Sequence, residues 1–419
     1  GASQTGFGRT GTVDWQTGSI KTANFTAANG EGYFCNTSGG AFTATLPASP
    51  SAGDIVSFSD YTRTFQTNNL TVGRNSEKIG GIAADAVLST EGQTATFVYV
   101  DSTEGWINVQ ETSNSVTGNP FLVATGGTVT TCGNFKIHTF TGPGTFTVCK
   151  VSCTAAENTV GYLVIAGGGG GGSNHGGGGG AGGFREGRNA PIDNFTASPL
   201  VANAPTNAVT VTAQAYPITV GAGGTAPGNC QQAKGSNSVF STITSTGGGS
   251  GVGGSQAGQP GGSGGGAGGQ GGPGGGNGNT PSTTPAQGAN GGCAPNPDAA
   301  AGGGGGAVDA GSPGGPRCVP GGPGGDGTAT SITGSPVTRA GGGGGGNGGK
   351  PGPSAPGVGG TGGPGGGGNG GGITFDSSEG TTNTGGGGGG GSNPAGMPSG
   401  AQTSRNGGSG IVIIRYKFQ

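Results

Sequence analysis

The sequence is poor in charged side chains and in the residues that catalysis most often uses. Charged residues make up 8% of its 419 positions and the formal net charge is −2, whereas an ordinary protein has about 25% charged residues. There are two histidines. His138 lies on a predicted hairpin and is expected at the surface, and His175 lies within a glycine run, where it is expected to be exposed or to decorate the glycine region. So little positive charge gives no electrostatic reason to expect nucleic acid or an anionic membrane as a partner.

Long apolar runs are also missing. The longest, residues 162–166 and 411–414, are far too short to span a bilayer, so no membrane insertion is predicted. No helical pattern accompanies the many G-x-G-x-x-G matches, which therefore carry no information about dinucleotide binding. Gly349-Lys350 is followed by Pro351 rather than the Ser or Thr of a phosphate-binding loop.

Catalytic and metal-binding constellations have few residues from which to form. The seven cysteines are an odd number and prescribe no disulfide framework. Cys149 and Cys153 could close a local loop or bind a metal with His138, but no second pair of ligands follows. The few acidic residues of the second half lie in glycine-rich loops rather than as a pair in a groove. We therefore expect neither an enzyme nor a cofactor.

Glycine is the residue present in excess. It occupies 112 positions, about four times its usual share of roughly 7%. Only 22 of these glycines lie in residues 1–165, which leaves 90 for the remaining 254 residues. The sequence therefore predicts an ordinary β-rich first part and a second part that is dominated by glycine.

The first part reads as an arm followed by β modules. Residues 1–19 have little apolar surface and are predicted as an extended N-terminal arm, residues 20–117 as a small all-β module, and residues 118–165 as a β-hairpin that serves as connector or base. Alternating apolar residues and turn signals predict the strands, at residues 31–35, 41–46, 54–58, 95–100 and 106–109, with a hairpin of 134–139 and 145–148. Residues 95–100 are apolar on both faces, which predicts a strand that is central or covered by a partner subunit.

In residues 166–419 short β-branched strands lead into glycine runs. Helix is excluded because each glycine costs about 1 kcal/mol relative to alanine, and ordinary sheet gains nothing from a residue without a side chain. Collagen is excluded because residues 349–357 break its three-residue period. Two interpretations remain: disorder, or polyglycine type II helices whose N–H and C=O groups bond neighbouring helices.

The strands that recur between the glycine runs favour the ordered interpretation. We expect strands 162–166, 209–220, 238–244, 330–339 and 411–417 to form a β base from which antiparallel pairs of glycine helices rise. The predicted fold class is therefore all-β N-terminal modules followed by a glycine-rich domain with a β base, packed polyglycine type II helices and a C-terminal strand at 410–418.

Polar inserts interrupt the glycine runs at residues 277–298, 350–356, 374–384 and 392–406. They are predicted to form turns at the far end of the helices, and loops held on a rigid scaffold are where binding usually resides. Uncharged polar side chains suit a glycan, and one methionine offers an apolar contact. The candidate binding residues are Asn279, Thr280, Asn296, Asn383, Asn393, Met397, Gln402 and Asn406.

The order of several motifs resembles tail-fibre proteins of marine tailed phages. In the first module the similar segments are Gly32-Tyr33-Phe34, Thr45-Leu46-Pro47-Ala48, Thr67-Asn68-Asn69-Leu70-Thr71, Gly73-Arg74-Asn75 and Tyr99-Val100-Asp101-Ser102-Thr103. The second part resembles the glycine-rich domain of the same fibres in Ile137-His138-Thr139-Phe140 and in residues 162–172, 218–224 and 410–419. The expected packing of polyglycine helices side by side is also similar to the lattice of tail-tip adhesins of some T-even phages, in which loops between glycine helices contact the receptor.

This resemblance implies a fibre protein on the virion surface or outside the cell. It implies a homotrimer that is joined to other virion fibre or tail proteins through its N-terminal arm. It also implies binding to a host surface receptor, either a glycan or an outer-membrane component. The alternative is a subunit of an extracellular filament or a capsid-attached fibre with a purely structural role.

Overall fold

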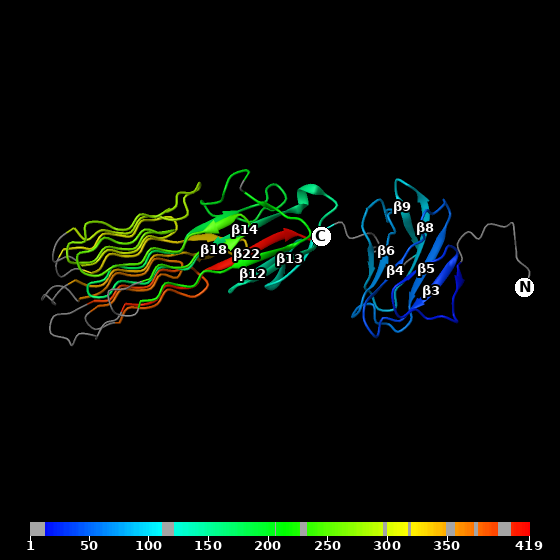
Figure 1. Ribbon diagram of the computed structural model, residues 1–419, viewed down its shortest axis with the longest axis horizontal. Coiled ribbons are helices and arrows are strands. Elements are labelled where there is room, and N and C mark those ends of the chain that lie inside the picture. Colours follow the sequence, from blue (N-terminus) through cyan, green and yellow to red (C-terminus); the bar gives the residue numbers. More distant parts are fainter. Residues whose placement is uncertain are drawn as a thin grey trace, which may run out of the picture. The chain divides into compact units, whose positions relative to one another are not determined.

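The computed structural model describes residues 13–110, 121–205, 207–226, 233–295, 300–316, 320–348, 357–372, 376–392 and 404–419. The chain divides into two compact units (Figure 1). Unit 1 comprises Gly1–Phe121 and Ser152–Thr154, and unit 2 comprises Leu122–Val151 and Ala155–Gln419. Regular structure in the described residues is strand apart from one short 3-10 helix, Ala155–Asn158, so none of their helices is long and apolar enough to cross a bilayer.

Unit 1 is built from two sheets that share one core. The first sheet has the order β1-β3-β5-β8-β9, with bounds Asp14–Trp15, Glu31–Cys35, Ile55–Asp60, Thr94–Asp101 and Gly105–Gln110. The second has the order β2-β4-β6-β7, with bounds Phe25–Thr26, Phe42–Thr45, Leu70–Gly73 and Ala86–Leu88. Alternate residues of both sheets, among them Phe58, Phe97 and Leu70, face each other and are fully buried, as the period-two pattern predicts.

The structure changes the predicted N-terminal arm and places the predicted strand at 95–100. The arm predicted over residues 1–19 is shorter, because Asp14 and Trp15 form β1 and pair in parallel with Glu31 and Gly32. The strand expected at 95–100 is β8, which lies inside its sheet between β5 and β9. Its outward face is covered at Thr96, which is buried, and is exposed only at its C-terminal end, where Val100 is 46% exposed.

Unit 2 contains a sandwich of two further sheets, of five and six strands. One has the order β10-β13-β17-β18-β19, with bounds Val123–Thr125, Gly144–Lys150, Ala215–Thr219, Ser238–Phe240 and Ile243–Ser245. The other has the order β11-β12-β22-β14-β15, with β16 also paired to β14; the bounds are Thr128–Cys132, Phe135–Phe140, Ile411–Lys417, Thr159–Ile165, Phe184–Gly187 and Val209–Thr210. A separate hairpin is formed by β20 (Thr328–Thr330) and β21 (Val337–Arg339).

The two uninterrupted apolar runs of the sequence become the central pair of the second sheet. β14 and β22 pair antiparallel, with Leu163 opposite Ile413, and both are buried along nearly their whole length. One face packs on the other sheet around Phe146 and Tyr416. The opposite face packs against Phe184 and the segments that cover it. Burial on both faces explains why these strands are continuously apolar rather than alternating.

Two predictions about this region are wrong. The strands near 134–139 and 145–148 do not form a hairpin, because β12 and β13 belong to opposite sheets; β12 instead pairs with β11 and β22. The predicted boundary at residue 165 also fails, since β12, β13 and β14 lie in the same compact unit as the glycine runs. The strands before and after residue 165 therefore form one β base.

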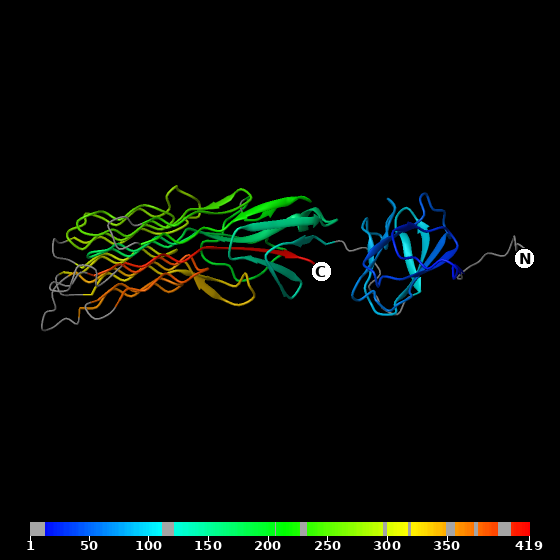
Figure 2. The same ribbon diagram turned by 60° about the horizontal axis from the view of Figure 1, so that its bottom comes forward.

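Glycine runs leave the strands and return to them. Residues 166–173 follow β14, and residues 176–183 lead back to β15. Figures 1 and 2 show these and the later runs side by side, extending away from the strand end of unit 2. Nearly all of the glycines in them are buried, so the glycine region is folded as one body with the β base.

The runs are joined by backbone hydrogen bonds with a period of three residues. The N–H groups of Gly167 and Gly170 donate to residues 236 and 233, those of Gly168 and Gly171 to residues 408 and 405, and those of Gly169 and Gly172 to residues 180 and 177. One run thus donates to three neighbours in turn, through bonds of 2.8 to 3.0 Å. Each buried amide obtains its acceptor from another run.

This close packing explains why the runs are glycine. A Cβ on Gly168 would lie 2.1 Å from the carbonyl oxygen of Gly386, and a Cβ on Gly171 would lie 2.1 Å from that of Gly389. Any side chain at these positions would push neighbouring backbones apart and break the bonds between them. Glycine is therefore required by the approach of backbone to backbone.

Candidate functional site

Half of the predicted binding residues lie outside the described residues, and these are Asn296, Asn393, Met397 and Gln402. The other four are Asn279, Thr280, Asn383 and Asn406. The structure does not bring these four together into one site. Each forms hydrogen bonds within its own loop or with the glycine runs.

Asn279 organises the loop in which it lies. Its backbone is left-handed, with φ of 49°. Its Oδ1 accepts hydrogen bonds from the N–H of Thr283 at 2.9 Å, the hydroxyl of Thr283 at 3.0 Å and the N–H of Gln287 at 3.2 Å. The neighbouring Thr280 is exposed, and its hydroxyl donates to the carbonyl of Gly278 at 3.1 Å.

This loop lies at the strand end of unit 2, which corrects the prediction that every insert is at the far end. The carbonyl oxygen of Gln287 accepts a hydrogen bond from the N–H of Phe184 in β15, at 2.8 Å. Its side-chain Oε1 accepts one from the N–H of Thr246, directly after β19, at 2.9 Å. The described end of the insert at 374–384 is also at the base, where Thr384 accepts from Ala340, one residue after β21.

Asn383 and Asn406 form hydrogen bonds within the set of packed glycine runs, which we call the glycine lattice. Asn383 contacts Ser409 through its N–H and its Oδ1, at 3.0 and 3.2 Å. The Oδ1 of Asn406 accepts from the N–H of Ala226 at 2.8 Å. The Oδ1 atoms of further asparagines also accept from backbone N–H groups of glycines, namely Asn237 from Gly247, Asn290 from Gly278 and Asn369 from Gly362. Asparagine thus completes the hydrogen bonds at the border of the lattice.

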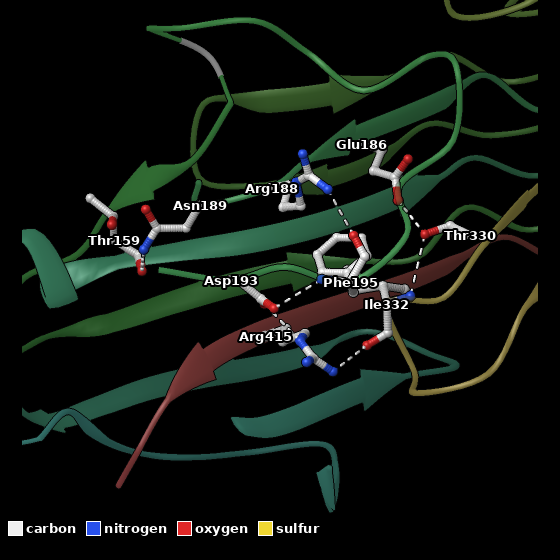
Figure 3. A network of polar contacts seen from close by, with 9 residues as sticks. All are labelled: Thr159, Glu186, Arg188, Asn189, Asp193, Phe195, Thr330, Ile332 and Arg415. Atoms are coloured by element: carbon white, nitrogen blue, oxygen red, sulfur yellow. Dashed lines mark hydrogen bonds and ion pairs between the residues drawn. The ribbon is translucent and has the colours of Figure 1, made fainter. Parts of the chain in front are cut away.

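Sequence reasoning missed a buried polar network on the outer face of the central strands (Figure 3). Its centre is Arg415 of β22, whose Nε lies 2.7 Å from Oδ2 of Asp193 in a pair whose side chains are 5% and 2% exposed. The guanidinium also donates to the carbonyl of Ile332 at 3.2 Å. It stacks over the rings of Phe135 and Phe195, with centroid distances of 4.4 and 5.5 Å. Pairing and added hydrogen bonds are what a buried charge requires.

The second member of the network is Glu186 of β15, which is 1% exposed. Oε2 accepts from the N–H of Ser198 at 2.7 Å and from its hydroxyl at 2.5 Å, and Oε1 accepts from the hydroxyl of Thr330 in β20. Burial raises the pKa of this carboxyl, while the hydrogen bonds from Ser198 and Thr330 lower it and leave a net increase. Figure 3 shows the contact between Glu186 and Thr330, which joins β15 to the β20–β21 hairpin.

A carboxyl with a raised pKa is often a catalytic acid, but the surroundings of Glu186 favour a structural role. Both of its oxygens are already bonded to side chains of the same chain. Nearby, Arg188 donates to the carbonyl of Phe195 at 2.9 Å and Asn189 to that of Thr159 at 2.9 Å. The network therefore fastens the loop after β15 onto the sheet.

The three residues considered for a metal site differ in burial, since the histidine is buried and both cysteines are exposed. His138, expected at the surface, is fully buried; its Nδ1 lies 2.7 Å from the carbonyl of Gly126 and its Nε2 lies 3.3 Å from the hydroxyl of Tyr416. Burial lowers its pKa. Cys149 and Cys153 are exposed free thiols. In the described ranges, no group of three or more His, Cys, Asp or Glu side chains could hold a metal ion.

The second histidine, His175, lies at the turn between the first two glycine runs. It is half-buried and has a left-handed backbone, with φ of 57°. Burial is also the main cause of its lowered pKa. Its side chain is therefore partly covered by the glycine region and not fully exposed to solvent.

A family described as a glycine-rich domain matches residues 139–417. That range covers the strands from β13 to β22 and all of the glycine runs between them. No curated protein matches the chain.

Proposed function

Because the chain belongs to the glycine-rich domain family, we propose that it is a structural fibre protein that works as an adhesin. In this proposal it is a subunit of a phage tail fibre, located on the virion surface, and binds a host surface receptor that is a glycan or an outer-membrane component. The observation that carries the proposal is the bonding of glycine runs to one another and to a β base. A body held by backbone hydrogen bonds suits a rigid support for recognition surfaces.

We further propose that the glycine runs are polyglycine type II helices. This helix has three residues per turn and no internal hydrogen bonds. The three-residue period with which Gly167 to Gly172 donate to three different neighbours supports this assignment. The antiparallel order of successive runs also supports the assignment, since a run that leaves the β base is followed by one that returns to it.

A catalytic role is not part of the proposal. Glu186, whose pKa burial raises, and His138, whose pKa burial lowers, are buried and hydrogen-bonded within the fold. A general acid or base must reach the proton that it transfers, and these buried groups do not reach a substrate at the surface. Recognition through the polar inserts, including Asn279 and Thr280, is the expectation that we retain.

We propose that the subunit forms a homotrimer through residues 1–165, with residues ahead of β1 joining other fibre or tail proteins. The support is an exposed apolar side chain on each of two neighbouring strands, Val100 of β8 and Val109 of β9, which are 46% and 55% exposed. Cover by a second surface would remove this apolar area from water. Light scattering of the full chain measures the mass, and a monomer at all concentrations would remove this part of the proposal.

The function is tested by immunogold electron microscopy of virions with an antibody raised against the chain. We expect label at tail fibres, together with competition by the purified chain for phage adsorption to the host. Label on a capsid fibre or on a free filament, without competition for adsorption, would favour the alternative role as a structural filament subunit and refute the adhesin.

A further inference from the structure

An open cleft of about 250 Å³ lies on unit 2 beside the start of the glycine runs. Its lining is Gly127, Thr128, Thr139, Phe140, Thr141, Gly142, Pro143, Gly144 and Thr145. These residues come from the start of β11, the end of β12 and the turn into β13. Phe140 is opposite Val412, the second residue of β22, so the cleft is at the end of the sheet that receives the last glycine run.

The lining is rich in hydroxyl groups and has no charged side chain. Thr128, Thr139, Thr141 and Thr145 contribute four hydroxyls, and none of them has a hydrogen-bond partner in the described part of the chain. Three of these threonines are exposed and Thr139 is half-buried. A hydroxyl both donates and accepts, so the cleft offers several donors and acceptors without any charge.

Two glycines shape the lining of the cleft. Gly127 has a left-handed backbone, with φ of 63°, and a Cβ there would lie 2.7 Å from the carbonyl oxygen of Thr139. A Cβ on Gly144 would lie 3.2 Å from the ring of Phe140. Both positions bring backbone close to the aromatic ring, where a side chain would force the lining to shift.

These features select the kind of ligand. Ionic ligands find no countercharge in the lining, and a protein partner would need buried aromatic or arginine anchors that the cleft does not offer. Pockets that hold drug-sized ligands measure roughly 300–1,000 Å³, so a cleft of about 250 Å³ suits a smaller ligand of one ring. A neutral sugar is a small ring that both donates and accepts hydrogen bonds.

We propose that this cleft binds one neutral pyranose ring through the hydroxyls of Thr128, Thr139, Thr141 and Thr145. The proposal rests on the adhesin function and names a glycan as the receptor class. It also places a contact with that glycan on the β base, outside the polar inserts.

The test uses the full chain with its threonine methyl groups labelled with carbon-13. Methyl glycosides of glucose, galactose, mannose and N-acetylglucosamine are titrated separately while the methyl resonances are recorded. We expect at least one sugar to shift the methyls of the four cleft threonines saturably, with a dissociation constant near the millimolar range that is typical of weak sites, about 1 mM. The methyl of Thr130, exposed on the same strand, should not move.

Two variants make the result specific. The double substitution Thr128→Val and Thr145→Val removes two hydroxyls and keeps the β-branched shape, and should weaken the best sugar roughly fivefold or more because two hydrogen bonds are lost. Thr130→Val is the matched control and should bind as the parent does. All of the threonines changed are exposed, so both variants should keep the parent's methyl spectrum elsewhere.

Several outcomes would overturn the cleft proposal. They are the absence of any saturable shift, shifts confined to threonines outside the cleft, and unchanged affinity in the double variant. Adsorption of the purified chain to host cells is measured in parallel. Adsorption without a cleft shift refutes the sugar site alone, whereas a chain that neither adsorbs nor binds a sugar refutes the adhesin function as well.

Discussion

Gly178→Ala should destabilise unit 2 because backbone surrounds this position on several sides. A Cβ on Gly178 would lie 2.0 Å from the carbonyl oxygen and 2.5 Å from the carbonyl carbon of Gly343, and 3.0 Å from the nitrogen of Gly304. The distance from the Cβ to the carbonyl oxygen would have to lengthen by about 1.4 Å to reach the ordinary range, which begins at 3.4 Å. None of these atoms belongs to a flexible side chain, so whole runs would have to move.

The size of the effect follows from three terms. Overpacking costs about 1–3 kcal/mol. Gly178 also donates to Gly302 at 3.0 Å and accepts from Gly266 at 2.7 Å, and each weakened hydrogen bond costs about 0.5–1.5 kcal/mol. Restriction of the unfolded chain by alanine offsets about 0.4–1 kcal/mol. The net loss is about 3 kcal/mol, which lowers Tm by roughly 6–12 °C at the 2–4 °C per kcal/mol that applies to domains of this order of size.

Gly274→Ala is the matched control within the same lattice. No atom of the described chain lies within 4 Å of the position that its Cβ would take, so only the unfolded-chain term remains, and Tm should stay unchanged or rise slightly. Differential scanning calorimetry of both variants decides the matter. Equal Tm values for the two variants would show that the region around Gly178 is not packed, and the reasoning would fail.

Four further outcomes are expected. Asp193→Ala should cost about 3–5 kcal/mol because it leaves its buried arginine partner uncompensated, as chemical denaturation would measure. Asp376→Ala, at a surface pair with an N–O distance of 3.6 Å, should cost less than about 1 kcal/mol. The pKa of Glu186 is raised by burial, so the folded chain keeps its proton longer than the unfolded chain. The free energy of unfolding should therefore fall as pH rises from the ordinary glutamate value of 4.5 through the raised pKa, and Glu186→Gln should remove this slope. An aromatic disulfide reagent should label the exposed Cys149 in the native chain but reach Cys35 only on unfolding, because Cys35 is fully buried and its pKa is raised to about 12.

Much of the β structure could be predicted because its signals are local. β3 and β8 follow apolar alternation, and β14 and β22 follow continuous apolar runs bounded by glycine. β15 was missed because Phe184–Gly187 contains two charged residues and a glycine and resembles a loop. The hairpin prediction failed because the same turn residues can join two strands of one sheet or two strands of opposite sheets.

The candidate site was harder to predict because its contacts are distant in sequence. Asn406 bonds Ala226 across 180 residues, and Arg415 pairs with Asp193 across 222 residues. Composition identified the polar inserts, but it could not show that Asn279 and Gln287 lie at the β base. A polar residue between glycine runs can complete the lattice as well as face a ligand, and only the register of the runs separates these roles.

The central claim is that the glycine runs form an ordered lattice bonded from run to run, and amide hydrogen exchange tests it most directly. The decisive segments are residues 247–276 and 357–372, in which Gly262, Gly360 and Gly370 donate to other runs at 2.8 to 2.9 Å. The account predicts that these three amides exchange far more slowly than in a random coil, because exchange requires opening of the lattice. Exchange of all three at random-coil rates would contradict it.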